Sequence, residues 1–164
     1  MTDETDKEIV PYFRSNKTQI TFEFFYILIT FIVATTMMTL IHFKIGIFSI
    51  DHNSKILVYS FIGGFLGGWT LMSKWFYRTT ARGKNNQHPN LWESHKFYWR
   101  ILTPFVSALI AFSIFILVST DSLPLSIQTK ESAKVAFGFS FIFGYFSDIM
   151  MSKLSKWIES AMDK

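Results

Sequence analysis

The sequence contains no cysteine, which excludes disulfides, thiolate metal sites and cysteine nucleophiles. The four histidines do not have the spacing of a metal site. There is no P-loop, no dinucleotide-binding fingerprint and no Ser–His–Asp arrangement. The sequence therefore predicts a protein that is not an enzyme and that has no metal site and no cofactor.

Long apolar stretches are abundant instead. Four of them, 22–43, 56–72, 101–119 and 133–151, hold between 17 and 22 residues each. A helix rises about 1.5 Å per residue and the hydrocarbon core of a bilayer is about 30 Å thick, so about 20 apolar residues cross it. The sequence predicts an all-α polytopic membrane protein with four transmembrane helices within 20–151.

The distribution of basic residues predicts the orientation of this bundle. The tail 1–19, the connection 73–100 and the tail 152–164 together carry twelve lysines and arginines, whereas the two short connections carry four. Basic residues accumulate on the cytoplasmic side of membrane proteins. Both termini and the connection 73–100 are therefore expected in the cytoplasm. The tail 152–164 has the sequence pattern of an amphipathic helical extension.

The connection 73–100 is expected to end in a helix over 91–100. Asn90 and Glu93 have the spacing of a capping box at its start. Pro104 lies in the first apolar turn that follows. We expect a kink at this proline rather than a break, because neighbouring helices can satisfy the freed carbonyl.

Small residues recur at every fourth position in two of the apolar stretches. Such stripes allow close approach of helix backbones in membranes. They indicate either packing within one bundle, or a contact between subunits, or the lining of a pore. The residues are Ser60, Gly64 and Gly68 in the second stretch and Ala136, Ser140 and Gly144 in the fourth.

A few ionisable residues lie within or beside the apolar stretches, and the threading places them near the cytoplasmic interface. A charge at mid-bilayer costs roughly 2.5–3.5 kcal/mol on insertion scales, so these side chains are expected to pair in an ionic layer. The alternative is a role in proton or ion coupling. The residues are Glu23, Lys74, Arg78, Arg100 and Asp148.

The run Gly138-Phe-Ser-Phe-Ile-Phe-Gly-Tyr-Phe-Ser-Asp148 carries a family resemblance. It is similar to the Gly-Phe…Gly-Phe-Ser-acid segment of small, poorly characterised bacterial four-span membrane proteins. Some of those proteins accompany anti-phage and other conflict genes. The resemblance implies a place in a defence system and supplies no catalytic residues.

We therefore expect a small homo-oligomeric component of a bacterial inner membrane, in a defence or stress system. It would act as a membrane-perturbing effector, or as a membrane anchor or sensor for a cytoplasmic protein partner. The alternative is a small ion or solute channel or transporter. The expected contacts are with the lipid bilayer and with further copies. Nucleic acid is not expected, because the basic residues follow the membrane topology.

Overall fold

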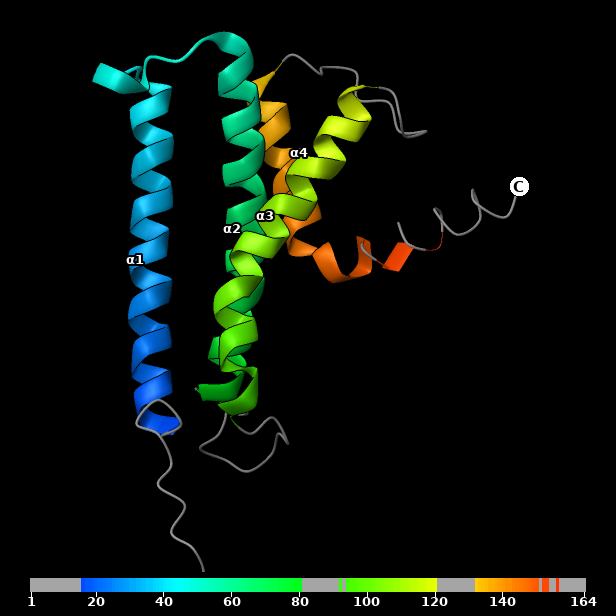
Figure 1. Cartoon of the computed structure of the whole chain (residues 1–164). Coiled ribbons are helices and arrows are strands. Elements are labelled where there is room, and N and C mark those ends of the chain that lie inside the picture. The colour runs from blue at the N-terminus through cyan, green and yellow to red at the C-terminus, as the bar shows by residue number, and fades with distance from the viewer. Residues whose placement is uncertain are drawn as a thin grey trace, which may run out of the picture.

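A computed structural model describes residues 16–80, 92, 94–120, 132–150, 152, 153 and 156. All regular elements within these residues are helical (Figure 1). They are α1 (Asn16–His42), η2 (Gly46–Phe48), α2 (His52–Thr80), η4 (Ser94–Lys96), α3 (Phe97–Ser119) and α4 (Ala133–Tyr145), where η denotes a 3₁₀ turn. The all-helical fold predicted from the sequence is confirmed for the described residues.

Three of the described helical segments are long and apolar enough to cross a membrane, as judged by length and composition. They are Lys17–His42, His52–Thr80 and Ser94–Ser119. The helix α4 is apolar but has only 13 residues. These features indicate a membrane protein.

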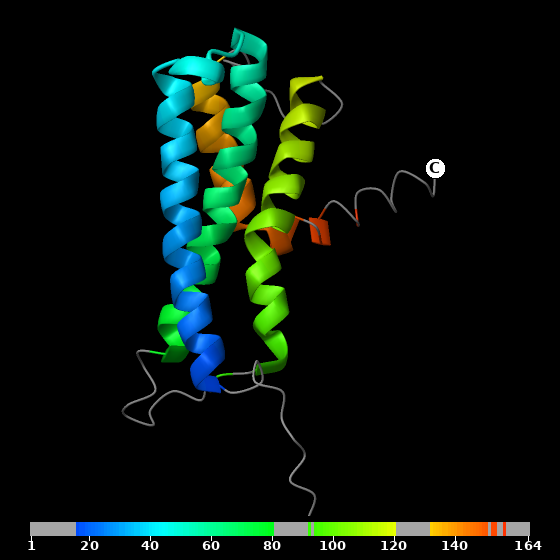
Figure 2. The ribbon, with the colours of Figure 1, turned by 60° about the vertical axis from the view of Figure 1, so that its left-hand side comes forward.

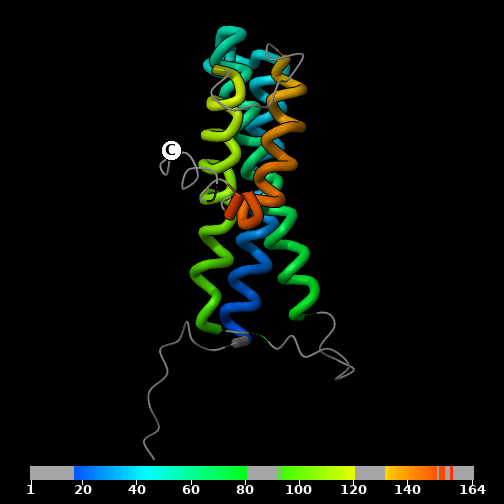
Figure 3. The backbone as a smooth tube through the Cα atoms, turned by 90° about the vertical axis from the view of Figure 1, so that its right-hand side faces the viewer, coloured from blue at the N-terminus to red at the C-terminus, as the bar shows by residue number. Residues whose placement is uncertain are grey.

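The fourth predicted span, 133–151, is not one straight helix. α4 ends at Tyr145, Phe146 forms a turn, and helical backbone resumes at 147–150. Figures 1 and 3 show that the turn lies partway along α2 and α3, and that the chain leaves the bundle sideways there. The predicted amphipathic tail 152–164 lies almost entirely outside the described residues.

α2 is the central helix, and its most extensive contact is with α4. Two glycines of α2 face α4. A Cβ added to Gly63 would collide with the carbonyl oxygen of Phe137, and one added to Gly67 would collide with that of Phe141. The two backbones therefore approach so closely that only glycine fits at these positions.

The neighbouring glycines, Gly64 and Gly68, face an adjoining side of α2, toward α3. A Cβ added to Gly64 would lie 2.7 Å from the Cβ of Ala111, and one added to Gly68 would lie 2.6 Å from Oγ of Ser107. α2 thus uses glycines on two adjoining faces, one for each partner helix.

The predicted small-residue stripes lie between helices of the same chain. Gly144 of α4 packs on the backbone of Gly64. Ser60 and Ser140 are buried and share a hydrogen bond of 2.6 Å. Ala136 is also fully buried. These residues pack helices of one chain together.

α1 stands beside this core (Figure 2). Large apolar side chains are exposed along most of its length. Polar tips of aromatic side chains connect it to the other helices at three levels. The contacts are Trp69 Nε1 to the carbonyl of Ile27 at 3.0 Å, Tyr26 Oη to the carbonyl of Ile101 at 2.8 Å, and His42 Nδ1 with Tyr59 Oη at 3.0 Å.

α3 continues through Pro104, so the proline does not break the helix. A proline has no N–H and therefore removes one backbone hydrogen bond from the turn before it. In that turn, the carbonyl of Ile101 accepts the hydrogen bond from Tyr26. The helix predicted over 91–100 is shorter than expected, because a 3₁₀ turn precedes the start of α3 at Phe97. Asn90 and Glu93 lie outside the described residues.

Candidate functional site

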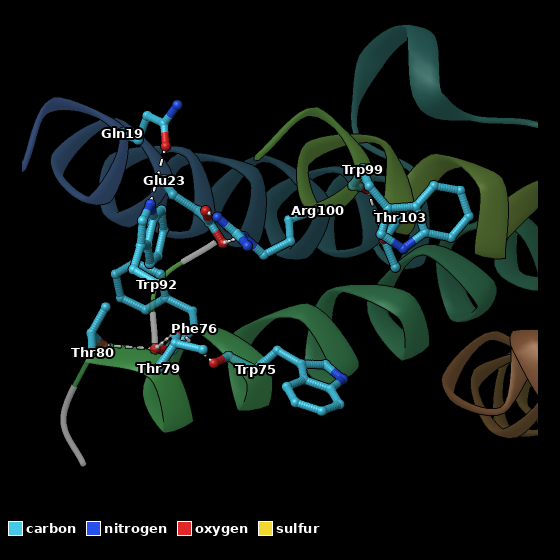
Figure 4. A network of polar contacts seen from close by, with 10 residues as sticks. All are labelled: Gln19, Glu23, Trp75, Phe76, Thr79, Thr80, Trp92, Trp99, Arg100 and Thr103. Atoms are coloured by element: carbon cyan, nitrogen blue, oxygen red, sulfur yellow. Dashed lines mark hydrogen bonds and ion pairs between the residues drawn. The ribbon is translucent and has the colours of Figure 1, made fainter. Parts of the chain in front are cut away.

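A cluster of polar side chains lies where α1 and α3 begin, near the end of α2 (Figure 4). Its centre is an ion pair between Glu23 of α1 and Arg100 of α3. Nε of Arg100 lies 2.9 Å from one carboxylate oxygen of Glu23 and 3.1 Å from the other. Glu23 is 0% exposed and Arg100 is 9% exposed, so the pair is buried.

The opposite side of this cluster is formed by Trp92. The guanidinium carbon of Arg100 lies 4.1 Å from the centroid of the indole ring, which is a cation–π contact. The indole N–H of Trp92 donates a hydrogen bond of 3.0 Å to Oε1 of Gln19. Phe76 of α2 contacts the same indole edge-on. The cluster therefore joins α1, α2, α3 and the segment before α3.

The planar guanidinium explains how one side chain makes both contacts. Its edge donates to the carboxylate while its face stacks on the indole, which a lysine cannot do in the same way. Removing one partner of a buried pair leaves an uncompensated charge and costs about 3–5 kcal/mol. The cluster is built to hold three helices together at one end of the bundle.

The other residues of the predicted ionic layer lie elsewhere. Nζ of Lys74 donates a hydrogen bond of 2.9 Å to Oη of Tyr145, on the α4 side of α2. The guanidinium of Arg78 lies 5.7 Å from the ring centroid of Trp75. Asp148 is exposed just after the turn that ends α4. The structure thus joins Glu23 to Arg100 directly and places these three residues outside that pair.

Sequence reasoning missed Gln19 and Trp92 as members of the cluster. Gln19 precedes Glu23 by four residues and so shares its face of α1, which is a signal that was available. The contact of Trp92 joins positions 73 residues apart. No local sequence pattern predicts that contact.

A second buried polar contact, also missed, fixes the end of α4. The hydroxyls of Ser107 and Ser147 are both buried and lie 2.9 Å apart. Ser147 directly follows the turn at Phe146. Together with the Lys74–Tyr145 contact, this hydrogen bond attaches both sides of the turn to the bundle.

At the opposite end of the bundle, Asp51 caps α2. The backbone N–H of Ser54 donates a hydrogen bond of 3.0 Å to Oδ2 of Asp51. Hydrogen bonds from Ser54 hold the pKa of Asp51 below its ordinary value of 3.8. Asp51 lies outside the helices that are long enough to cross a membrane.

Within the described part of the chain, no group of three or more histidine, aspartate or glutamate side chains is placed to hold a metal ion. No protein-family model, curated protein or solved structure matches this chain. The site is therefore interpreted from its own geometry.

Proposed function

We propose that the protein is a non-enzymatic, homo-oligomeric component of a bacterial cytoplasmic membrane that perturbs the bilayer as part of a defence or stress system. The other form of the proposal is a membrane anchor or sensor subunit that serves a cytoplasmic protein partner. The observation that supports perturbation is the depth at which α4 leaves the bundle.

The position of Gly67 defines that depth. A Cβ added to Gly67 would lie 2.7 Å from the backbone nitrogen of Tyr145, so the end of α4 is level with Gly67. α2 continues from there for thirteen residues to Thr80, which is about 20 Å at about 1.5 Å per residue. The exposed Trp75, an interface-type residue, is eight residues beyond Gly67, or about 12 Å.

This depth puts polar groups inside the acyl region of one leaflet. Asp148 is exposed within one turn of Tyr145. A charged side chain at such a position recruits water or thins the bilayer locally, because leaving it in hydrocarbon is costly. A chain that turns sideways here therefore acts as a wedge in that leaflet.

A liposome leakage assay tests this proposal. Purified protein in vesicles should release a trapped dye, and Asp148→Leu should reduce the release while the protein stays folded and inserted. Ile149→Leu, a neighbouring exposed position without charge, is the matched control. Equal release by wild type and Asp148→Leu would refute the wedge.

The proposed orientation places both termini and the connection 73–100 in the cytoplasm, following the distribution of lysine and arginine. Single cysteines test it, since the chain has none. A cysteine at Asn53 should be labelled by an impermeant reagent from outside intact cells, and one at Asn85 should not. The reverse pattern would overturn the orientation.

The alternative proposal, a small ion or solute channel, needs polar residues along one face through the bilayer. The polar residues within the apolar stretches that could line such a face are Thr30, Thr35, Thr36, Thr39, Ser107 and Ser140. The hydroxyls of Thr30, Thr35 and Thr39 donate to carbonyls of their own helix at 2.6–2.8 Å. The same vesicles distinguish the two proposals, because a channel would conduct ions and retain the dye.

A further inference from the structure

We propose that Lys74, Arg78 and Tyr145 form a binding site for the phosphate of an anionic phospholipid. The site lies on α2, just past the point where α4 leaves it. This inference rests on the membrane location proposed above but not on the wedge.

The face of α2 that holds α4 continues beyond α4. Gly63 and Gly67 form the close contact with α4. Lys74 and Arg78 lie seven and eleven residues after Gly67, which returns them to the same helix face. α4 ends at Tyr145 and so does not cover this face of α2 any further. Beyond the end of α4, the face carries the two cations Lys74 and Arg78.

Lys74 is already held in place for an anion. Its Nζ lies 2.9 Å from Oη of Tyr145 and 5.6 Å from the centroid of the same ring. The side chain of Lys74 is nevertheless exposed. An ammonium has three N–H donors, so Lys74 can donate to a phosphate oxygen as well as to the phenol.

Arg78 supplies the second cation, one turn further on. Its guanidinium lies 5.7 Å from the ring centroid of Trp75, which is 47% exposed. Arginine stacked on an indole keeps its N–H donors free for a phosphate. A tryptophan at this position is typical of the headgroup region of a membrane.

Charge balance favours an anionic ligand. Among the residues that the structure describes, no carboxylate lies within ion-pairing distance of Lys74 or Arg78. In contrast, Nε of Arg100 is paired with the carboxylate of Glu23 nearby. The two cations of α2 therefore present a net positive site level with Trp75, a residue type of the headgroup region.

The test compares the protein in nanodiscs of phosphatidylglycerol with nanodiscs of phosphatidylcholine, and counts bound lipids by native mass spectrometry. Wild type should retain phosphatidylglycerol preferentially. Each cation near an anionic lipid contributes about a fivefold gain in binding, so Lys74→Gln with Arg78→Gln should lower retention about 25-fold. The matched control is Lys44→Gln with Lys134→Gln, which removes the same charge from exposed positions at the other end.

Three results would overturn the site. The first is equal retention by wild type and the Lys74/Arg78 variant, and the second is an equal loss in the control variant. The third is a change of oligomeric mass in the Lys74/Arg78 variant with phosphatidylglycerol retention unchanged, which would make a second copy the occupant.

A second variant guards against misfolding. Tyr145→Phe keeps the ring and removes only the hydroxyl that holds Lys74, so it should lower retention with little effect on thermal stability. Unchanged phosphatidylglycerol retention in Tyr145→Phe would show that the phenol hydroxyl is not part of the site. Dye leakage is scored separately, so loss of the wedge activity with lipid preference intact refutes the proposed function and leaves this site standing.

Discussion

Arg100 lies between the carboxylate of Glu23 and the indole of Trp92, with Nε 2.9 Å from one and the guanidinium carbon 4.1 Å from the centre of the other. The first contact joins positions 77 residues apart, and neither partner of the ion pair is more than 9% exposed. Such an arrangement makes the pair sensitive to the loss of either charge.

Glu23→Gln should destabilise the bundle by about 3–5 kcal/mol, because Arg100 would be left buried without a counter-ion. The free energy of unfolding in detergent, from denaturant titration, checks this. The double variant Glu23→Gln with Arg100→Gln should recover part of the loss, since it buries no unpaired charge. Additive losses in the double variant would show that the two side chains act independently.

Gly67→Ala and Gly138→Ala are the same substitution with opposite expected results. The new methyl at 67 meets the backbone of α4, which should cost about 1–3 kcal/mol by overpacking. At 138 nothing lies within 4 Å of the added Cβ, and alanine should stabilise the helix by about 0.5–1 kcal/mol. Thermal unfolding of both variants decides the matter. Equal melting temperatures would contradict the packing of α2 on α4.

Trp69→Phe removes the indole N–H that bonds to Ile27 and keeps an aromatic ring to stack on Phe31. Hydrogen bonds between membrane helices contribute about 0.6 kcal/mol on average, so the loss of stability should be small. Because α1 would be held less firmly to α2, a cysteine on the α2-facing side of α1 should react faster with a lipid-soluble thiol reagent. A loss as large as that of Glu23→Gln would mean that the tryptophan has a larger packing role.

Asp51 gives a prediction on pH. Its pKa is lowered in the folded protein, so the cap contributes stability above the ordinary pKa of the carboxyl group and loses it as pH falls through the lowered value. NMR titration should therefore place the pKa of Asp51 below 3.8, and Ser54→Ala should raise it toward that value. The variant removes the hydrogen bond from the Ser54 hydroxyl and keeps the one from its backbone N–H, so an unchanged pKa would assign the shift to backbone N–H groups.

The helices were predictable because long apolar stretches have few other solutions. The threading also grouped Glu23 and Arg100 at the same end of the bundle, and the structure pairs them. The turn at Phe146 was not predictable, because no proline follows it and the apolar residues Ile149, Met150 and Met151 come after the Ser-Asp pair. The turn is fixed by the distant partners Lys74 and Ser107.

The glycines of α2 show the same limit on a finer scale. The sequence Gly63-Gly64 followed by Gly67-Gly68 predicts close helix packing. It contains two overlapping pairs at a spacing of four, Gly63 with Gly67 and Gly64 with Gly68. Which pair meets α3 and which meets α4 depends on where those helices lie. Spacing within α2 holds no information on that choice.

The contact between α2 and α4 also sets an order of events during synthesis. The ribosome adds 78 residues between Gly67 and Tyr145, which takes about 4–16 seconds at about 5–20 residues per second. Helix pairs form far faster than that. For this interval the glycine face of α2 meets lipid, the insertion machinery or other nascent copies before it meets its own partner, so the extent of correct assembly depends on how crowded that membrane is.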